Sequence, residues 1–314
     1  MKKDAKIYVA GHAGMVGSAI MRALSARGYS QLITASHAAV DLCDASAVGR
    51  FLKEKRPQYV FLAAAKVGGI QANKSHPVEF LRDNLTIQNN IIHHACLNEV
   101  KKLVFLGSSC IYPRECPQPM KEESLMTGPL EPTNEGYALA KIAGLRLAQY
   151  YQREYGLECL NPMPCNLYGA NDSFDPANSH VLSALVKRFV DAAEARTPEV
   201  TLWGSGIARR EFLHVDDLAR ALLLLVEKWH SPEIINVGCG ADVSIKELAS
   251  LIAGKTGYLG KISWDTTMPD GMLRKCLDVS KLNALGYRPE ITLEQGIEGV
   301  IADYRKLTQG VAQP

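Results

Sequence analysis

Short apolar runs alternate with segments of helical pattern along the first half of the chain, and this alternation limits the possible folds more than any other feature. The runs cover residues 6–10, 32–33, 59–63 and 102–106 and are rich in β-branched and aromatic residues. A segment able to form a helix separates each run from the next. Such an order predicts βαβ units around a buried parallel sheet. We therefore expect an α/β fold with a Rossmann-like, doubly wound parallel sheet and a smaller α/β lobe.

Charge and cysteine content narrow the class of protein. The 314 residues include 35 basic and 33 acidic side chains, a net charge of +2, which argues against a nucleic-acid-binding protein. The eight cysteines form no C-x-x-C pair and no regular pattern, so we expect neither a metal site nor disulfide bonds. No apolar run reaches the ~18 residues that span a membrane. We expect a cytoplasmic protein that does not bind membranes.

The first residues superficially resemble a signal peptide, because two lysines precede an apolar stretch. Asp4, Lys6 and His12 interrupt that stretch, and a strand, a turn and a helix explain it better. The turn is rich in glycine and reads G-x-x-G-x-x-G. Such a turn after a strand lets the backbone approach a pyrophosphate at the positive end of a helix. We expect the whole turn to contact a dinucleotide: Gly11, His12, Ala13, Gly14, Met15, Val16 and Gly17.

The end of the second strand leaves the choice of dinucleotide open. An acidic residue there normally binds the ribose 2′-hydroxyl of NAD, but residues 34–37 contain no carboxylate. They contain no arginine either, so Ser36, His37 or a distant group would have to bind the 2′-phosphate of NADP. The segment 41–44, Asp-Leu-Cys-Asp, either contacts the adenine or caps the next helix.

Tyr137 and Lys141 lie four residues apart and so share one face of a predicted helix. A neighbouring ammonium would lower the pKa of the tyrosine from about 10, and the phenol could then protonate a carbonyl oxygen that receives a hydride. The alternative is an ordinary surface pair on an amphipathic helix. The glycine-rich turn and the serine pair 108–109 upstream favour the catalytic interpretation.

Ser108 and Cys110 follow the fourth apolar run, at the strand end where parallel sheets gather their ligands. Ser108 would hydrogen-bond the oxygen that Tyr137 protonates. Cys110 is either a small buried apolar residue or, beside a ketone, a thiol that moves protons on carbon.

The second half of the chain is less regular. Helical patterns cover residues 137–155, 181–195, 217–229 and 245–256, and we expect Asp216 or Asp217 to cap the third of these helices. A proline-rich loop over 113–133 either lines a cleft or is a surface excursion. We expect a dinucleotide-binding domain over 1–163 and a substrate-binding domain over 164–314, with part of 207–238 returning to the first.

Ten strings of sequence, from 11–17 to 269–271, support a family resemblance. They cover 11–17, 63–70, 107–113, 131–135, 137–141, 166–169, 178–181, 203–206, 210–217 and 269–271. Together they resemble the GDP-L-fucose synthases, which are short-chain dehydrogenase/reductases of the extended type. The resemblance runs from about Lys6 to Tyr304.

This resemblance implies an enzyme that epimerises GDP-4-keto-6-deoxy-D-mannose at C3 and C5 and reduces it at C4 with NADPH. Tyr137 would then be the proton donor to O4, with Lys141 as its modulator and Ser108 as its neighbour. Cys110 and His180 would be the acid/base pair for the epimerisations. The implied substrate contacts are Arg188, Trp203, Arg210 and Asp270, and the further cofactor contacts are Leu106, Gly107, Ser109, Pro164, Cys165, Asn166 and Leu167.

The sequence departs from the family pattern at three positions. Ala13 and His37 stand where bacterial members often carry arginines for the 2′-phosphate, so NADP(H) is implied by the resemblance rather than by these residues. Cys165 stands where threonine is more common.

Two other functions remain to be tested. An enzyme of the GDP-L-colitose synthase type would epimerise C5 and reduce C4 of a 3-deoxy sugar with the same residues. A non-catalytic dinucleotide sensor would have lost catalytic residues. The five residues implied to be catalytic are all present: Ser108, Cys110, Tyr137, Lys141 and His180. By analogy with the fold family we also expect a homodimer, formed through helices near 88–98 and 137–155.

Overall fold

Six parallel strands form the main sheet of the computed structural model, which describes residues 1–175, 179–268 and 270–310. The strands are β1 (Ile7–Ala10), β2 (Leu32–Ile33), β3 (Tyr59–Leu62), β4 (Lys102–Phe105), β5 (Glu158–Pro164) and β9 (Ile234–Val237). Their order in space is β2-β1-β3-β4-β5-β9, and every neighbouring pair is parallel. The predicted Rossmann-like α/β fold is confirmed.

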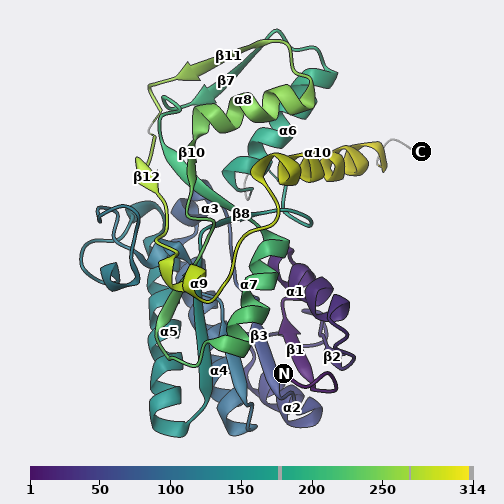
Figure 1. Cartoon of the computed structure of the whole chain (residues 1–314), viewed down its shortest axis with the longest axis vertical. Coiled ribbons are helices and arrows are strands. Elements are labelled where there is room, and N and C mark those ends of the chain that lie inside the picture. The colour runs from purple at the N-terminus through teal and green to yellow at the C-terminus, as the bar shows by residue number, and fades with distance from the viewer. Residues whose placement is uncertain (176–178, 269, 311–314) are drawn as a thin grey trace.

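Helices cover the main sheet, and every residue of β1, β4 and β9 is buried beneath them. One group consists of α1 (Met15–Ala26) and α7 (Val215–Lys228), which pack together. A second group contains α2 (Ala45–Lys55), α4 (Pro77–Leu97) and α5 (Glu135–Tyr155), with α4 packed on both of the others (Figure 1). Near-continuous burial along strands is what coverage of both faces of a parallel sheet requires.

A smaller set of strands and helices forms the other end of the molecule (Figure 1). The strand β8 (Arg209–His214) pairs with β6 (Asn166–Tyr168), β10 (Asp242–Ser244) and β12 (Arg274–Lys275). A separate parallel pair joins β7 (Glu199–Trp203) to β11 (Lys261–Asp265). The helices α6 (Val181–Glu194), α8 (Ile245–Thr256) and α10 (Leu293–Gly310) pack on one another and enclose a second core around Phe189.

Short elements connect these two parts. They are α3 (Ile70–Ser75), α9 (Ser280–Ala284) and the single-turn 3₁₀ helices η1 (Ser109–Ile111), η2 (Glu122–Ser124) and η3 (Pro132–Asn134). Met163, where we place the domain boundary, lies inside β5, and the chain returns to the main sheet at β9. The division into two functional domains stays a prediction.

The predicted strands and helices agree closely with the observed ones, but the predicted cap of α7 is wrong. His214 caps this helix, and its Nδ1 accepts a hydrogen bond from the Asp216 N–H at 3.2 Å. Asp217 instead lies fully buried, where Arg220 and the N–H groups of Glu290 and Ile291 donate to its carboxylate.

The proline-rich loop and the search for a membrane-spanning helix complete the description of the fold. The proline-rich loop is attached to the molecule, because Met120 forms a β-bridge with Leu277 and both residues are buried. Asn178 and Pro269, which belong to the strings quoted above, lie outside the described residues. Within the described residues, no helix combines the length and apolarity needed to cross a bilayer.

Candidate active site

A cavity of about 1670 Å³ lies at the carboxyl ends of the main strands and extends to the smaller part of the molecule. The strand order reverses between β1 and β3, and such a reversal opens a crevice that binds ligands in α/β sheets. The volume exceeds the roughly 300–1,000 Å³ of a typical single-ligand pocket. It therefore leaves room for a cofactor and a substrate together.

The cavity gathers residues that lie far apart in the sequence, including nearly all of the predicted site. Lining residues from that prediction are Gly11, His12, Ala13, Gly14, Met15, Val16, Gly17, Leu106, Gly107, Ser108, Ser109, Cys110, Tyr137, Lys141, Pro164, Cys165, Asn166, Leu167, His180, Trp203, Arg210 and Asp270. Arg188 is the exception. Its exposed side chain turns to β7 and donates to the Thr201 carbonyl oxygen at 3.0 Å, outside the cavity lining.

Unpartnered polar atoms mark this cavity as a place for a ligand. Among the described residues, eight buried side-chain nitrogen or oxygen atoms lack a hydrogen-bond partner, and six of them belong to cavity residues. The six are on His12, Asn73, Glu131, Asn134, Ser179 and His180. Because buried polar groups are normally satisfied, these atoms are suited to bonds with a bound molecule or water.

The three glycines of the first turn meet different requirements. Gly11 has a φ of +81° and its backbone lies against Ala64, while a side chain at Gly17 would overlap the carbonyl oxygen of Gly11. At Gly14, which precedes α1, an added Cβ would meet only ordinary contacts within the protein. The missing side chain at Gly14 therefore opens space above the N-terminus of α1. That N-terminus carries no acidic residue in its first turn, as an anion site requires.

The segment after β2 caps the next helix and also lines the cavity, while its contact with adenine stays a prediction. Asp44 caps α2 by accepting a hydrogen bond from the Ala47 N–H at 3.0 Å. Asp41 lines the cavity together with Ser36 and His37, and its carboxylate lies 3.8 Å from Nδ1 of His37. The imidazole is 84% exposed, so it is free to reach a ligand at this end of the cavity.

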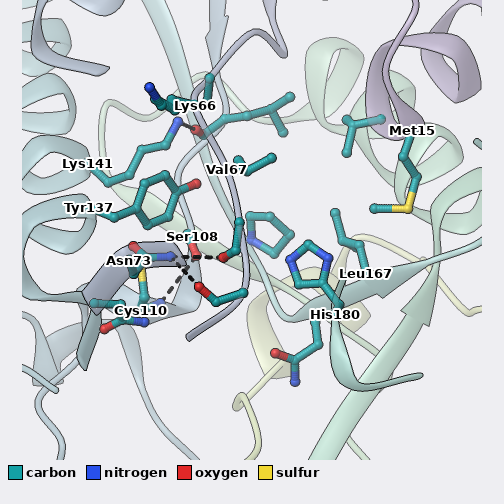
Figure 2. Close-up of a pocket in the computed structure, with 18 of the residues that line it drawn as sticks. Met15, Lys66, Val67, Asn73, Ser108, Cys110, Tyr137, Lys141, Leu167 and His180 are labelled. Carbon is teal, nitrogen blue, oxygen red and sulfur yellow. Dashed lines mark hydrogen bonds between the residues drawn. The ribbon is translucent and has the colours of Figure 1, made fainter. Parts of the chain in front are cut away.

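Tyr137 and Lys141 both face the cavity from α5, on the same side as Ser108 and Cys110 (Figure 2). The amine of Lys141 is buried, donates to the Leu106 carbonyl oxygen at 2.8 Å, and lies 5.7 Å from the Tyr137 ring centroid. The interpretation as a surface pair is therefore excluded, since this lysine is only 4% exposed.

The pKa shift predicted for Tyr137 is wrong in direction. Burial raises the pKa of the phenol well above its usual value, and the neighbouring Cys110 raises it further. Burial also lowers the pKa of Lys141 to about 8. Desolvation outweighs the attraction between the two groups, because each charge would have to form away from water. Tyr137 is thus a neutral phenol at neutral pH, which is the form that donates a proton.

Ser108 and Cys110 lie where β4 ends and η1 begins. The Ser108 hydroxyl accepts a hydrogen bond from the Cys110 N–H at 3.3 Å, which holds the two residues in one tight turn (Figure 2). The Cys110 side chain is 7% exposed, and burial raises the pKa of its thiol. Cys110 is therefore both buried and part of the cavity wall, and the raised pKa keeps its thiol neutral.

His180 enters the cavity from another direction, at the residue that precedes α6. Its Nδ1 lies 3.7 Å from the Asp172 carboxylate, too far for a hydrogen bond but close enough to orient the ring. Asp172 is itself held by the Ser183 hydroxyl. Cys110 and His180 thus come from separate elements to one space, as two proton-transfer groups acting on one ligand must.

The remaining predicted substrate contacts lie on the smaller part of the molecule. Trp203 ends β7 with 68% of its side chain exposed, so its ring is available for stacking. Arg210 is on β8, where burial lowers its pKa and the nearby Glu131 and Asp270 oppose that effect. Asp270 accepts hydrogen bonds from the N–H and hydroxyl of Ser205, at 2.7 and 2.8 Å.

Residues 164–167 join the two parts of the molecule along the cavity. Cys165 donates its N–H to the Val237 carbonyl oxygen of β9 at 3.0 Å, while Asn166 donates its side-chain amide to the Glu211 carbonyl oxygen of β8 at 2.8 Å. The segment therefore fixes β8, with Arg210, relative to the main sheet.

Several cavity residues were missed in the sequence. Lys66, Asn73 and Glu131 line the cavity and belong to or adjoin strings that carried the resemblance, so their position was a usable signal. Lys275 also lines it, but stands in the irregular carboxyl-terminal part without any pattern to mark it. Only the pairing of β12 with β8 brings Lys275 to the site.

Known proteins similar to this chain belong to a family of dinucleotide-dependent enzymes, as the Rossmann-like sheet and its cavity lead us to expect. The model of the NAD dependent epimerase/dehydratase family matches residues 7–238. The chain belongs to this family. It is 52% identical over 297 residues to the putative GDP-L-fucose synthase 2 of Arabidopsis thaliana, covering 95% of this chain and 90% of that protein. Identity to the GDP-L-fucose synthase of Escherichia coli is 49%, over 93% of this chain and 94% of that one.

More distant family members have related names. The GDP-L-colitose synthase of Yersinia pseudotuberculosis is 40% identical, over 93% of this chain and 95% of its own. A solved GDP-L-fucose synthetase from Naegleria fowleri, bound to NADP, superposes with a TM-score of 0.90 at 28% identity and covers 98% of this chain and 96% of its own. The two fucose synthases from Arabidopsis thaliana and Escherichia coli are therefore more similar to this chain than the colitose synthase is.

Proposed function

We propose that the protein converts GDP-4-keto-6-deoxy-D-mannose to GDP-L-fucose, by epimerisation at C3 and C5 and NADPH-dependent reduction at C4. One observation carries this proposal: Cys110 and His180 share a cavity with Tyr137, Lys141 and Ser108. Reduction of a ketone needs only the last three. The additional thiol and imidazole are the groups that inversion at carbon requires.

NADP(H) fits the half of the cavity that lies along the main sheet. Gly14 leaves space for a pyrophosphate above the N-terminus of α1, and Lys141, which the family resemblance makes the ribose contact, lines the same cavity. His37 is the exposed side chain available to the 2′-phosphate. When bound, the reduced nicotinamide supplies the hydride for C4. The NADP-bound relative from Naegleria fowleri supports this cofactor.

Tyr137 and Ser108 act on the oxygen at C4. The raised pKa of Tyr137 keeps its phenol protonated, so it donates its proton to O4 as this oxygen gains negative charge. Ser108 donates a second hydrogen bond to O4, and Lys141 holds the ribose and supplies a positive charge. In the epimerisation steps the same two hydroxyl groups stabilise O4 while charge from the neighbouring carbon spreads onto it.

Cys110 and His180 move the protons on the carbons beside C4. One group removes a proton from one face of the sugar and the other returns a proton to the opposite face, which inverts the carbon. The two side chains come from η1 and from the start of α6. In the resting protein Cys110 is a neutral thiol, so we assign it the donating role in the first transfer and His180 the accepting role.

The smaller part of the molecule holds the nucleotide of the substrate. Arg210 and Asp270 frame one side, and Trp203 offers an aromatic surface to guanine or to a sugar. Arg188 would reach this ligand only by leaving its bond to Thr201. We assign the substrate domain proposed for residues 164–314 to this part, apart from the segment that returns to the main sheet.

Assembly and location are also part of the proposal. We propose a homodimer through α4 and α5, on whose surfaces Leu97, Leu139, Tyr150 and Tyr155 are exposed. A reducing compartment such as the cytoplasm suits the eight cysteines, all of which are unpaired.

A substrate comparison tests the proposed function. The purified protein is incubated with NADPH and either GDP-4-keto-6-deoxy-D-mannose or the corresponding 3-deoxy sugar, and absorbance of the reduced nicotinamide is followed. We expect the larger kcat/KM with the first substrate, and with NADPH rather than NADH. Preference for the 3-deoxy sugar would favour the colitose-type enzyme instead. Binding of NADPH without turnover of either sugar would favour a non-catalytic dinucleotide sensor.

A further inference from the structure

Lys275 lies in the cavity wall without a role in the mechanism described above. It is the second residue of β12, directly opposite Arg210 on β8. Its neighbours hold this short strand in position. Arg274 pairs with Asp242, and the Leu277 N–H donates to the buried Glu211 carboxylate at 2.8 Å. Because side chains alternate along a strand, Lys275 points away from Arg274 and into the cavity.

The amine of Lys275 has no partner of its own. Across residues 1–175, 179–268 and 270–310, no atom accepts a hydrogen bond from it and no carboxylate forms an ion pair with it. By contrast, Lys141 donates to Leu106 and Lys66 pairs with Glu79. An unpaired ammonium is costly to desolvate, and burial does lower the pKa of Lys275. An unpaired ammonium of this kind is suited to stabilise a negative charge that forms in the cavity only during the reaction.

Four ionisable groups surround Lys275: Cys110, Arg210, Cys165 and Glu131. The Arg210 guanidinium repels the Lys275 ammonium. Cys165 favours the charged form of Lys275 less than Cys110 does. The Glu131 carboxylate is the weakest of the four partners and already accepts bonds from the N–H and hydroxyl of Thr133. Cys110 is the group whose anionic form interacts most favourably with the Lys275 ammonium.

The same pairing holds from the side of Cys110. The side chains that favour its thiolate are, in decreasing order, Lys275, Ser108 and Lys141. The amine of Lys141 already donates a hydrogen bond to the Leu106 carbonyl oxygen. Tyr137, on the same helix, is a neutral phenol. The main positive charge available to a Cys110 thiolate is therefore the one on β12.

We propose that Lys275 is a positioning residue for Cys110, and that its ammonium stabilises the thiolate that remains when Cys110 gives its proton to the sugar. This inference rests on the proposed epimerisation. In that step the S–H bond breaks and its electron pair stays on sulfur. A C–H bond forms at the carbon beside C4, using the electron pair that had spread onto O4. The thiolate later takes a proton from the second carbon or from water.

The pH dependence of thiol alkylation tests this without substrate or cofactor. The purified protein is treated with iodoacetamide between about pH 6 and pH 10, a range that brackets an ordinary thiol pKa, and modification of Cys110 is measured by peptide mass spectrometry. In Lys275→Met the midpoint for Cys110 should move up by about one pH unit, so that alkylation near neutral pH slows about tenfold. Lys275→Arg should restore the midpoint of the unmodified protein.

Arg274→Met provides the matched control, because this neighbouring cation is exposed and pairs with Asp242 rather than facing Cys110. Its midpoint should not move. If Lys275→Met does not fold, Lys275→Gln replaces it and must give the same upward shift. A folded variant with an unchanged midpoint would overturn the proposal. An unchanged midpoint together with a higher KM for the GDP-sugar would instead identify Lys275 as a phosphate contact. Alkylation needs no turnover, so failure of the proposed function is detected separately.

Discussion

Burial shifts the pKa values of Tyr137 and Lys141 in opposite directions, and we expect this to set the pH dependence of reduction. The Tyr137 phenol stays protonated because burial raises its pKa, whereas the Lys141 pKa is lowered to about 8. On raising the pH, Lys141 is therefore the first of the two to lose its proton, and its positive charge disappears. We predict that kcat/KM for reduction falls as the pH passes through about 8. The measurement is a pH–rate profile with NADPH in excess.

Lys141→Arg separates this charge effect from others, since a guanidinium keeps its charge up to a pH of about 12. Its absolute rate will be lower, because the larger head must fit beside the Leu106 carbonyl oxygen. The fall in rate should nevertheless move to higher pH. A fall that remains near pH 8 would show that another group controls it.

The two chemical steps should fail separately in two conservative variants. Cys110→Ser removes the thiol but leaves Tyr137 and the glycine-rich turn in place, so we predict reduction without inversion. Tyr137→Phe removes the proton donor to O4, and we predict a loss of reduction by about 10²–10⁴-fold. Deuterium uptake from solvent into C3 and C5 reports epimerisation, and NADPH oxidation reports reduction. Normal deuterium uptake in Cys110→Ser would refute its assigned role.

Sequence patterns selected residues that share one cavity, but they did not reveal the electrostatics of these residues. Tyr137, Lys141, Ser108 and Cys110 follow from spacing and from positions at strand ends, which are local properties. The pKa of Tyr137 depends on how much protein surrounds it, and spacing alone does not reveal this. Lys275 was missed for a related reason, because its proximity to Cys110 arises from strand pairing.

At the scale of elements, two glycines of the glycine-rich turn are expected to serve different purposes: Gly14 ligand binding and Gly17 folding. Gly14→Ala introduces only ordinary contacts, so the melting temperature should hardly change, while the KM for NADPH should rise about tenfold or more through loss of the close approach. Gly17→Ala is the comparison variant, since its methyl group would overlap the Gly11 carbonyl oxygen and lower the stability. Thermal unfolding and NADPH titration distinguish the two effects. An unchanged NADPH affinity in Gly14→Ala would contradict this division.

Asp217 is predicted to anchor α7 to the carboxyl-terminal segment. It is completely buried and accepts bonds from Arg220 and from the backbone of Glu290 and Ile291. Asp217→Ala would leave these donors unpaired, and we expect the free energy of unfolding to drop by about 3 kcal/mol. The neighbouring Asp216 is exposed and pairs with Arg22, so Asp216→Ala should cost less than about 1 kcal/mol. Equal losses in urea unfolding would argue against the anchor.

The elements themselves could be predicted because their signals are local. Apolar runs gave β1 to β4, and helical periodicity gave α5 to α8 almost to the residue. Caps were less accessible: His214 rather than an aspartate caps α7, since the buried position draws Asp217 into other bonds. The strands β8 and β12 were not foreseen, because their pairing joins residues 65 positions apart in the chain.

At the scale of the whole molecule, the exposed apolar side chains of α4 and α5 predict self-association. Tyr150 is 48% exposed on α5, and replacing it with glutamate would bury a charge in the proposed interface. We predict that the unmodified protein sediments as a dimer and that Tyr150→Glu shifts it toward the monomer. Lys246→Glu changes the charge of an exposed residue on α8, away from the proposed interface, and controls for electrostatic effects. A monomer at micromolar concentration would refute the proposed interface.

The arrangement of the two parts of the molecule was only partly predictable. A sheet-rich first part and a less regular second part follow from the pattern of apolar runs, and we expected part of 207–238 to return to the first part. The cavity of about 1670 Å³ depends on residues 164–167 and on β8, which brings Arg210 toward Cys110 and Tyr137. These contacts are tertiary, and no local pattern encodes them.

Inversion and reduction take place in the same cavity if the proposed function is correct. The most direct measurement is to incubate the protein with GDP-4-keto-6-deoxy-D-mannose and NADPH in deuterated water and to determine the product by NMR. We predict GDP-L-fucose with deuterium at both C3 and C5. A reduced product that retains the D-configuration and carries no deuterium would contradict the account, because Cys110 and His180 would then have no role in the chemistry.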